Sequence, residues 1–316
     1  MLAPDAQAAL AVMAAAGAPA IETLPAAEAK RMFLESVPQL QGKKDAVAET
    51  RDLSAPSPAG EVPLRLYRGV GCPTAGAPAL LYFHGGGWVV GSIETHDNVC
   101  RWIANFAAGV VVSVDYRLAP EHPFPAAIED AAAALRYVAE NAGSLGIEAQ
   151  RIAVGGDSAG GNIAAVIALL ARDKEVPPIA FQMLIYPVTD VSASQDSYRR
   201  YAEDYGLTTA AMQWFRQQYL GPAGDGSDWR VSPLHAPTLA GLAPAFVATA
   251  GYDVLHDEAR DYVTRLREAH VPVQLDENTG QIHGFVSMDG LIGEGRRCIG
   301  RAVEAWQAQE TKTGGR

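Results

Sequence analysis

Short apolar runs alternate with longer amphipathic stretches through most of the chain. Runs of this length, bounded by turn residues, predict buried β-strands, and the stretches between them show the apolar spacing of helices. The expected strands are residues 79–83, 110–114, 151–154, 179–185, 245–250 and 271–275. The expected helices are about 96–108, 126–142, 160–172, 256–269 and 291–309. Near-continuous apolar strands alternating with helices indicate the α/β class, with a mostly parallel sheet covered by helices on both faces.

Two regions depart from this alternation. Residues 1–48 predict helices over about 5–16 and 26–35, followed by a turn and an alternating strand over 62–68. Residues 186–244 contain no strand pattern, although 197–221 has a helical pattern rich in aromatic residues. So long a segment without strands is unusual in a compact domain unless it is functional, so we expect it to cover the sheet as a cap. The predicted division is N-terminal cap helices in 1–50, an α/β core in 51–187 and 244–316, and a helical cap insertion in 188–243.

Charge and composition narrow the classes of partner. The chain has 316 residues and a net charge of −11, which argues against nucleic acid and anionic membranes as partners. No apolar stretch reaches the roughly 20 residues of a membrane-spanning helix, so we expect no stable membrane insertion. The start of the chain lacks the basic region of a signal peptide, and the three scattered cysteines form no disulfide or metal pattern. We therefore expect a cytoplasmic protein with no metal and no cofactor.

A candidate nucleophile lies in the stretch GDSAG, where Ser158 follows the expected strand 151–154 and precedes the expected helix 160–172. The G-x-S-x-G motif needs this strand–turn–helix context, because a sharp turn lifts the serine hydroxyl above the end of the sheet. A phosphate-binding loop is a poorer interpretation, since the lysine and hydroxyl residue that it requires are absent.

A glycine triplet in HGGGW follows the expected strand 79–83. Acyl transfer creates an oxyanion that needs N–H donors held in place beforehand. In folds with this nucleophile motif, the donors are the amide after the nucleophile and amides of an HGGG-type loop. We therefore expect the donors to be Gly86, Gly87 and Ala159, with His84 and Trp88 bracing the loop or lining the pocket.

The base and the acid follow from chain order. A serine nucleophile needs a base and a group that orients it, in the order Ser…Asp/Glu…His on this type of fold. His283 lies after the last expected core strand and is the best placed of the seven histidines. Asp253 directly follows the strand 245–250, whereas Asp257 lies in the first turn of the next helix. The predicted catalytic residues are therefore Ser158, Asp253 and His283.

Five motifs in this order resemble those of the bacterial hormone-sensitive-lipase-like esterases, also called family IV carboxylesterases. They are HGGGWVVG, VDYRLAPEHPFPAAIEDA, GDSAGGNIAA, DVLHDEARDY and IHGF, and the resemblance extends over about residues 60–305. It implies an α/β-hydrolase fold with a helical cap, the GDSAG subgroup, and hydrolysis of short- to medium-chain acyl esters of small molecules. One departure is Gln281, where the family pattern has methionine or another apolar residue.

The resemblance also implies an acyl pocket that uses cap aromatics and a homodimer formed through an edge strand. Ordinary core packing accounts equally well for each candidate pocket residue. These candidates are Trp88, Trp214, Phe215, Ile282 and Phe285. Two other functions stay open: another acyl hydrolase (an amidase, lactonase or deacetylase) on the same fold, or a non-catalytic ligand-binding protein.

Overall fold

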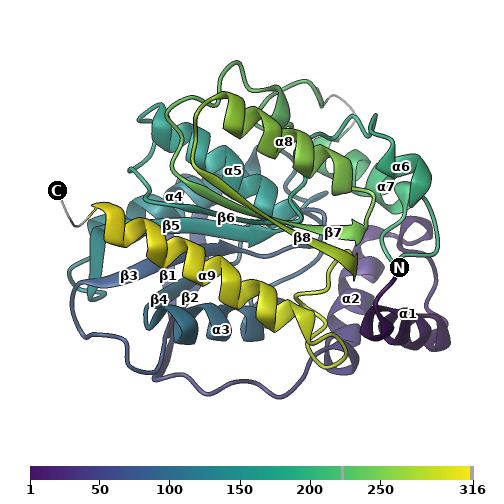
Figure 1. Cartoon of the computed structure of the whole chain (residues 1–316), viewed down its shortest axis with the longest axis horizontal. Coiled ribbons are helices and arrows are strands. Elements are labelled where there is room, and N and C mark those ends of the chain that lie inside the picture. Colours follow the sequence, from purple (N-terminus) through teal and green to yellow (C-terminus); the bar gives the residue numbers. More distant parts are fainter. Residues whose placement is uncertain (222–223, 314–316) are drawn as a thin grey trace.

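The computed structural model describes residues 1–221 and 224–313, and its centre is an eight-stranded sheet in the order β1-β2-β4-β3-β5-β6-β7-β8 (Figure 1). Strands β3 to β8 pair in parallel, and β2 pairs antiparallel with both β1 and β4. The predicted α/β class is therefore confirmed. The strands are β1 Glu49–Ser57, β2 Gly60–Arg68, β3 Ala77–Phe83, β4 Val110–Val114, β5 Ile147–Asp157, β6 Gln182–Ile185, β7 Ala245–Tyr252 and β8 Val273–Ile282.

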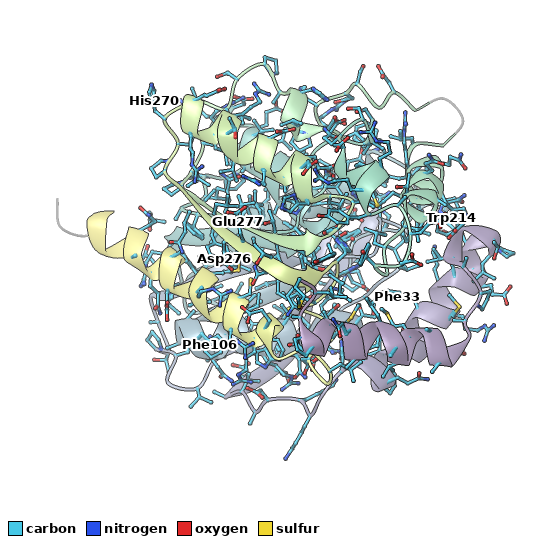
Figure 2. The ribbon with its side chains drawn as sticks, turned by 45° about the vertical axis from the view of Figure 1, so that its right-hand side comes forward. Phe33, Phe106, Trp214, His270, Asp276 and Glu277 are labelled. Atoms are coloured by element: carbon cyan, nitrogen blue, oxygen red, sulfur yellow. The ribbon has the colours of Figure 1, made fainter. Side chains whose placement is uncertain are left out.

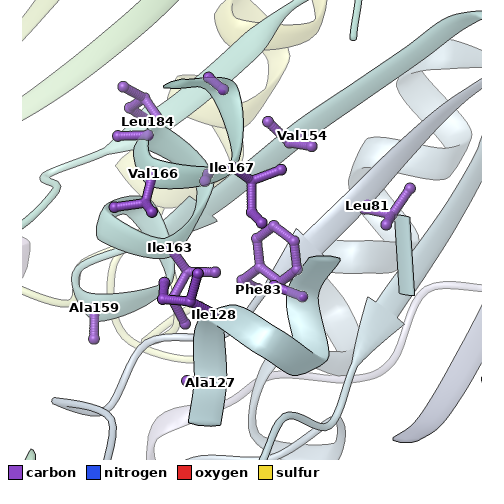
Figure 3. Packing of buried hydrophobic residues seen from close by; sticks show 14 of the residues in the cluster. Leu81, Phe83, Ala127, Ile128, Val154, Ala159, Ile163, Val166, Ile167 and Leu184 are labelled. Carbon is purple, nitrogen blue, oxygen red and sulfur yellow. The ribbon is translucent and has the colours of Figure 1, made fainter. Parts of the chain in front are cut away.

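Helices cover both faces of the sheet, and β3 shows how the alternation of side chains divides the core. Leu81 and Phe83 pack into one apolar cluster, which Figure 3 shows against Ile163 and Ile167 of α5. Leu80 and Tyr82 belong to a second cluster, on the face covered by α3 and α9. The helices are α1 Pro4–Ala16, α2 Ala26–Leu40, α3 Asp97–Ala107, α4 Ala126–Glu140, α5 Ala159–Arg172, α6 Ser197–Arg200, α7 Thr209–Leu220, α8 His256–Glu268 and α9 Glu294–Thr313, with 3-10 turns η1 Ile21–Thr23, η2 Glu94–His96 and η3 Pro233–His235.

Strand β1 was not predicted from the sequence. It is an edge strand that pairs along its whole length with β2, and most of its side chains are exposed or half-buried. An edge strand with one polar and one partly covered face lacks the continuous apolar run that identifies a central strand. The sequence predicted a turn directly before the strand over 62–68. This prediction was wrong for the residues up to Ser57, which belong to β1, and the turn consists only of residues 58–59.

The N-terminal helices and the segment after β6 lie together at one end of the molecule (Figure 1). A β-carbon at Gly206, between α6 and α7, would lie 3.6 Å from Cε of Met13 and 3.9 Å from Cδ2 of Leu10 in α1. The helix predicted over 197–221 is divided into α6 and α7, and between them Asp204 and Gly206 have positive φ angles that a continuous right-handed helix cannot contain. Residues 222–223 and 314–316, which fall within the predicted domain ranges, lie outside the described part of the chain.

Candidate active site

Ser158 occupies a sharp turn between β5 and α5. Its φ is 56° and its ψ is −120°, a strained conformation for a residue other than glycine. The turn brings α5 so close to β3 that a β-carbon at Gly160 would overlap the carbonyl of Phe83 and lie 2.6 Å from the carbonyl oxygen of His84. Glycine is therefore required at this position, and the turn lies directly against the start of the glycine loop.

Three side chains from distant parts of the sequence form a hydrogen-bonded row at the carboxyl edge of the sheet. His283 Nε2 lies 2.9 Å from Ser158 Oγ, and His283 Nδ1 lies 2.7 Å from Asp253 Oδ2. The other carboxylate oxygen of Asp253 accepts a hydrogen bond of 2.9 Å from the amide of Leu255. Asp253 follows β7 and is almost fully buried, whereas His283 follows β8 and keeps 12% of its side-chain surface exposed. A buried carboxylate of this kind orients an imidazole that can still reach a substrate.

The glycine loop after β3 has a backbone that only glycine adopts without strain. Gly86 has φ 119° and Gly87 has φ 58°. The amides of Val89 and Val90 both donate to the carbonyl of Gly86, at 3.1 and 2.9 Å. A β-carbon at Gly87 would overlap the ring of Phe215 in α7, so α7 packs directly on this loop.

A buried carboxylate joins this loop to the turn that carries Ser158. Asp157 Oδ1 accepts hydrogen bonds from the hydroxyl of Tyr82 at 2.8 Å and from the amide of Gly85 at 2.9 Å. The ring of His96 approaches the same carboxylate, with Nε2 3.2 Å from Oδ1. Burial by itself raises the pKa of Asp157, but His96 and the Tyr82 hydroxyl outweigh it, so the pKa lies below its usual value.

His84, at the start of the loop, is a supporting residue. Its ring is fully buried, stacks on Tyr116 at a centroid distance of 4.3 Å, and places Nδ1 2.8 Å from the carbonyl of Gly85. Tyr116 in turn donates to the carbonyl of His84 at 2.8 Å. Burial lowers the pKa of His84 to about 3, with a smaller contribution from His96, so the ring is neutral at physiological pH.

The predicted pocket residues fall into two groups. Trp88 lines a cavity of about 100 Å³ and stacks on Tyr219 at 4.3 Å. Trp214 lies edge-on to Phe215, at the end of the molecule where Figure 2 also shows Phe33 of α2. Ile282 and Phe285 are fully buried in the cluster covered by α3 and α9, and the structure does not bring them to the cavity.

Sequence reasoning missed several residues of the site. Asp157 was part of the GDSAG motif and His96 was placed at a helix start, but no local pattern links these two positions, which are 61 residues apart in the chain. Tyr186 lies against His283 with a ring-centroid distance of 4.6 Å. The remaining cavity lining was also missed: Val191, Ser192, Ala193, Tyr198, Met212, Gln213 and Arg216. Helical spacing placed Met212 and Arg216 on the cap, but it could not show that they face a cavity.

The parallel sheet, the strained serine turn and the Ser–His–Asp row together define the class of α/β-hydrolase-fold proteins. A family model described as the alpha/beta hydrolase fold matches residues 80–287. The chain belongs to this family, within which it groups with the hormone-sensitive-lipase-like carboxylesterases. The resemblance expected from the five motifs is therefore confirmed.

Several relatives are similar along most of their length. The carboxylic ester hydrolase LipN of Mycobacterium tuberculosis is 41% identical over 288 residues, which cover 89% of this chain and 76% of the relative. The ethyl acetate hydrolase of Pseudomonas putida is 42% identical over 290 residues, 91% of either chain. Among solved structures, the ester-hydrolase EH1AB1 from the metagenome of Lake Arreo has a TM-score of 0.95 at 44% identity, covering 98% of this chain and all of that one.

Neither a metal site nor a membrane-spanning helix occurs within residues 1–221 and 224–313. Over those ranges, no group of three or more His, Cys, Asp or Glu side chains is arranged to hold a metal ion. No helix in the same part of the chain combines the length and the apolar character that crossing a bilayer requires.

Proposed function

We propose that this chain is a serine carboxylesterase in which Ser158 is the nucleophile, His283 the general base and Asp253 the group that orients it. The observation that carries the proposal is the hydrogen-bonded row, with 2.9 Å between Ser158 Oγ and His283 Nε2 and 2.7 Å between His283 Nδ1 and Asp253 Oδ2. The esterase names of its relatives, which are similar over most of the chain, support the reaction class.

In the acylation step, Ser158 Oγ attacks the ester carbonyl carbon and its proton passes to Nε2 of His283. Asp253 holds the Nδ1–H tautomer and stabilises the imidazolium. The tetrahedral oxyanion accepts hydrogen bonds from the amides of Gly86, Gly87 and Ala159. The C–O bond to the leaving alcohol then breaks, and the alcohol takes the proton from His283.

Deacylation repeats these steps with water as the nucleophile. His283 takes a proton from water, and the hydroxide adds to the carbonyl carbon of the acyl group on Ser158. The bond between that carbon and Ser158 Oγ then breaks, Oγ takes the proton back from His283, and the carboxylic acid leaves. The positive end of α5, which begins at Ala159, stabilises both oxyanions.

The size of the cavity beside Trp88 favours short acyl chains. Its volume is about 100 Å³, below the roughly 300 Å³ at which pockets for drug-sized ligands begin. Trp88 and Phe215 are the predicted pocket residues nearest the glycine loop, and we assign them to the wall of the acyl site. Trp214, Ile282 and Phe285 are assigned to the packing behind that wall.

The test is hydrolysis of p-nitrophenyl esters from acetate to palmitate by the wild type and by Ser158→Ala. We expect a maximum at short to medium chains and a loss of at least about 10⁴-fold in the variant. Activity that survives the substitution would remove Ser158 from the mechanism. An amidase or lactonase is tested with matched anilides and lactones, and an anilide hydrolysed faster than its ester would replace the esterase assignment.

The cytoplasmic location and the homodimer stay predictions. Cys100 and Cys298 are buried free thiols and Cys72 is half-buried, a state that suits a reducing compartment. Both edges of the sheet end in a strand, β1 or β8, that could pair with a second copy. Sedimentation of the purified chain tests for a dimer.

A further inference from the structure

Three walls of the cavity beside the glycine loop are tied to the reacting centre, and Tyr198 of α6 completes the lining. Trp88 directly follows Gly87 of the loop. Val191, Ser192 and Ala193 belong to the segment after β6, which starts with the amide of Val188 donating to the carbonyl of Ser158 at 3.1 Å. The third wall is α7, whose Phe215 packs on Gly87. A group that fills this cavity is therefore held close to an ester bound at Ser158.

Polar side chains of α7 occupy one side of this cavity. Gln213 and Arg216 are three residues apart on the helix, so they lie on the same face, and both line the cavity. A β-carbon at Gly226 would lie 3.2 Å from Nη2 of Arg216 and 3.2 Å from Cγ2 of Val191, which places the guanidinium beside the Val191 wall. The lining thus combines an apolar part with a cation.

The side chain of Arg216 makes no hydrogen bond and no ion pair within residues 1–221 and 224–313, and among the arginine side chains in those ranges it shares this property only with Arg267. The carboxylates nearest to Gly226 in the chain have other partners: Asp228 pairs with Arg230, and Asp225 accepts from the amide of Ser227. Asp190, before the Val191 wall, accepts from Ser192 and Gln195 and approaches His235. The positive charge of Arg216 is therefore left available to a ligand.

We propose that Arg216 recognises a carboxylate on the substrate, so that the preferred substrates are esters with a negatively charged group a few atoms from the ester carbonyl. The inference rests on the proposed esterase function and names its substrate class. Arginine suits this task because its planar guanidinium binds a carboxylate through two parallel hydrogen bonds. The protein as a whole carries a net charge of −11, which repels anions, so a local cation is needed to select them.

The experiment compares esters that differ only in charge. Monomethyl succinate carries the carboxylate on the acyl side, and methyl succinamate is its neutral counterpart. On the alcohol side, 3-acetoxypropanoate and 3-acetoxypropanamide form the matching pair. Because the cavity is assigned to the acyl side, we expect kcat/KM of the wild-type protein to be about fivefold higher for monomethyl succinate than for methyl succinamate, and similar for the two esters of the alcohol-side pair. A preference for the anion in the alcohol-side pair alone would contradict this assignment. The preference should shrink as NaCl rises from about 0.02 M to about 0.5 M.

Three variants test the residue itself. Arg216→Gln should remove the preference by lowering kcat/KM for the anion while leaving the amide within about twofold, and Arg216→Lys should retain part of it. Arg267→Gln is the matched control, because the side chain of Arg267 also has no partner in the described part of the chain. Arg267 lies near the end of α8, close to His270, which Figure 2 shows at the opposite end of the molecule from Trp214. This control should keep the wild-type ratio.

The outcomes separate this inference from the esterase assignment. If neutral esters are hydrolysed in a manner that needs Ser158 but neither anion is preferred, the charge recognition is wrong and the esterase function stands. The charge recognition is equally wrong if Arg216→Gln lowers the rates of anion and amide by the same factor. If no ester is hydrolysed at all, the proposed function fails and this inference fails with it.

Discussion

The carboxylate of Asp157 accepts a hydrogen bond from the backbone amide of Gly85 at 2.9 Å. Asp157 immediately precedes Ser158, and Gly85 is the first glycine of the loop that supplies the proposed oxyanion donors. One side chain therefore joins the turn that carries the proposed nucleophile to the loop that carries the proposed oxyanion donors. Catalysis requires the serine turn and the glycine loop to be positioned to within a fraction of an ångström of each other. Substitution of Asp157 therefore tests whether this hydrogen bond maintains their relative position.

Asp157→Asn should lower kcat about tenfold with little change in KM. The amide keeps one oxygen for Tyr82 and Gly85, but it turns an NH₂ group toward His96 and loses the charge. Displaced oxyanion donors affect the transition state more than ground-state binding. Steady-state kinetics on p-nitrophenyl acetate measure both constants. Glu268→Gln, an exposed carboxylate-to-amide change, serves as the control, and a matching loss of kcat there would contradict the interpretation.

Asp253→Asn should reduce kcat by about 10⁴-fold, because an amide NH₂ in place of the carboxylate favours the wrong tautomer of His283. Asp257→Asn is the matched control four residues away. Asp257 pairs with Arg200 and His256 and does not contact His283, so we expect less than tenfold loss. Comparison of kcat for the two purified variants tests the choice between the two aspartates. Equal losses would show that Asp253 has been given the wrong role.

Gly87→Ala should lower kcat by about 10²-fold or more. The added methyl group overlaps the ring of Phe215 and places a side chain at φ 58°, so the loop must shift and its amide donors with it. Gly71→Ala provides the control, since Gly71 also has a positive φ, at 79°, but has open space around it. The Gly71→Ala variant should keep the wild-type kcat. If Gly87→Ala also keeps the wild-type kcat and loses only stability in thermal melts, the loop amides do not hold the oxyanion.

Glu258 should make the protein less stable as pH rises. It is fully buried and its Oε1 accepts from the amides of Thr189 and Asp190, at 2.7 and 3.1 Å. Burial raises the pKa of Glu258 well above its usual value despite these bonds. The folded state therefore keeps a proton that the unfolded chain releases above about pH 4.5, so the free energy of unfolding falls with rising pH until the folded-state pKa is reached.

Glu258→Gln should remove this part of the pH dependence. The free energy of unfolding of the variant minus that of the wild type should increase with pH, by up to about 1.4 kcal/mol per pH unit between pH 5 and pH 8. Urea unfolding at four pH values measures it. Parallel curves for the two proteins would mean that Glu258 is ionised in the folded state.

The central strands could be predicted from the sequence because each is a run of residues buried on both faces. Val110–Val114 begins and ends as predicted, since every residue of β4 is buried. Strand β8 extends to Ile282, well beyond the predicted 275, because residues 276–281 are all polar residues or glycine and therefore form no apolar run, although some of them are buried. One continuous helix over 197–221 was wrong because the backbone angles of Asp204 and Gly206, between α6 and α7, are incompatible with a right-handed helix.

The sequence by itself determined the order of the elements and the candidates for the nucleophile, the acid and the base. It could do so because parallel strands present their carboxyl ends at one edge, so residues that directly follow strands meet there. Tertiary structure alone decided which side chains touch: Asp157 with Gly85 and His96, Phe215 with Gly87, and Arg216 with the cavity. These contacts join segments far apart in the chain, and their geometry depends on packing that no local pattern encodes.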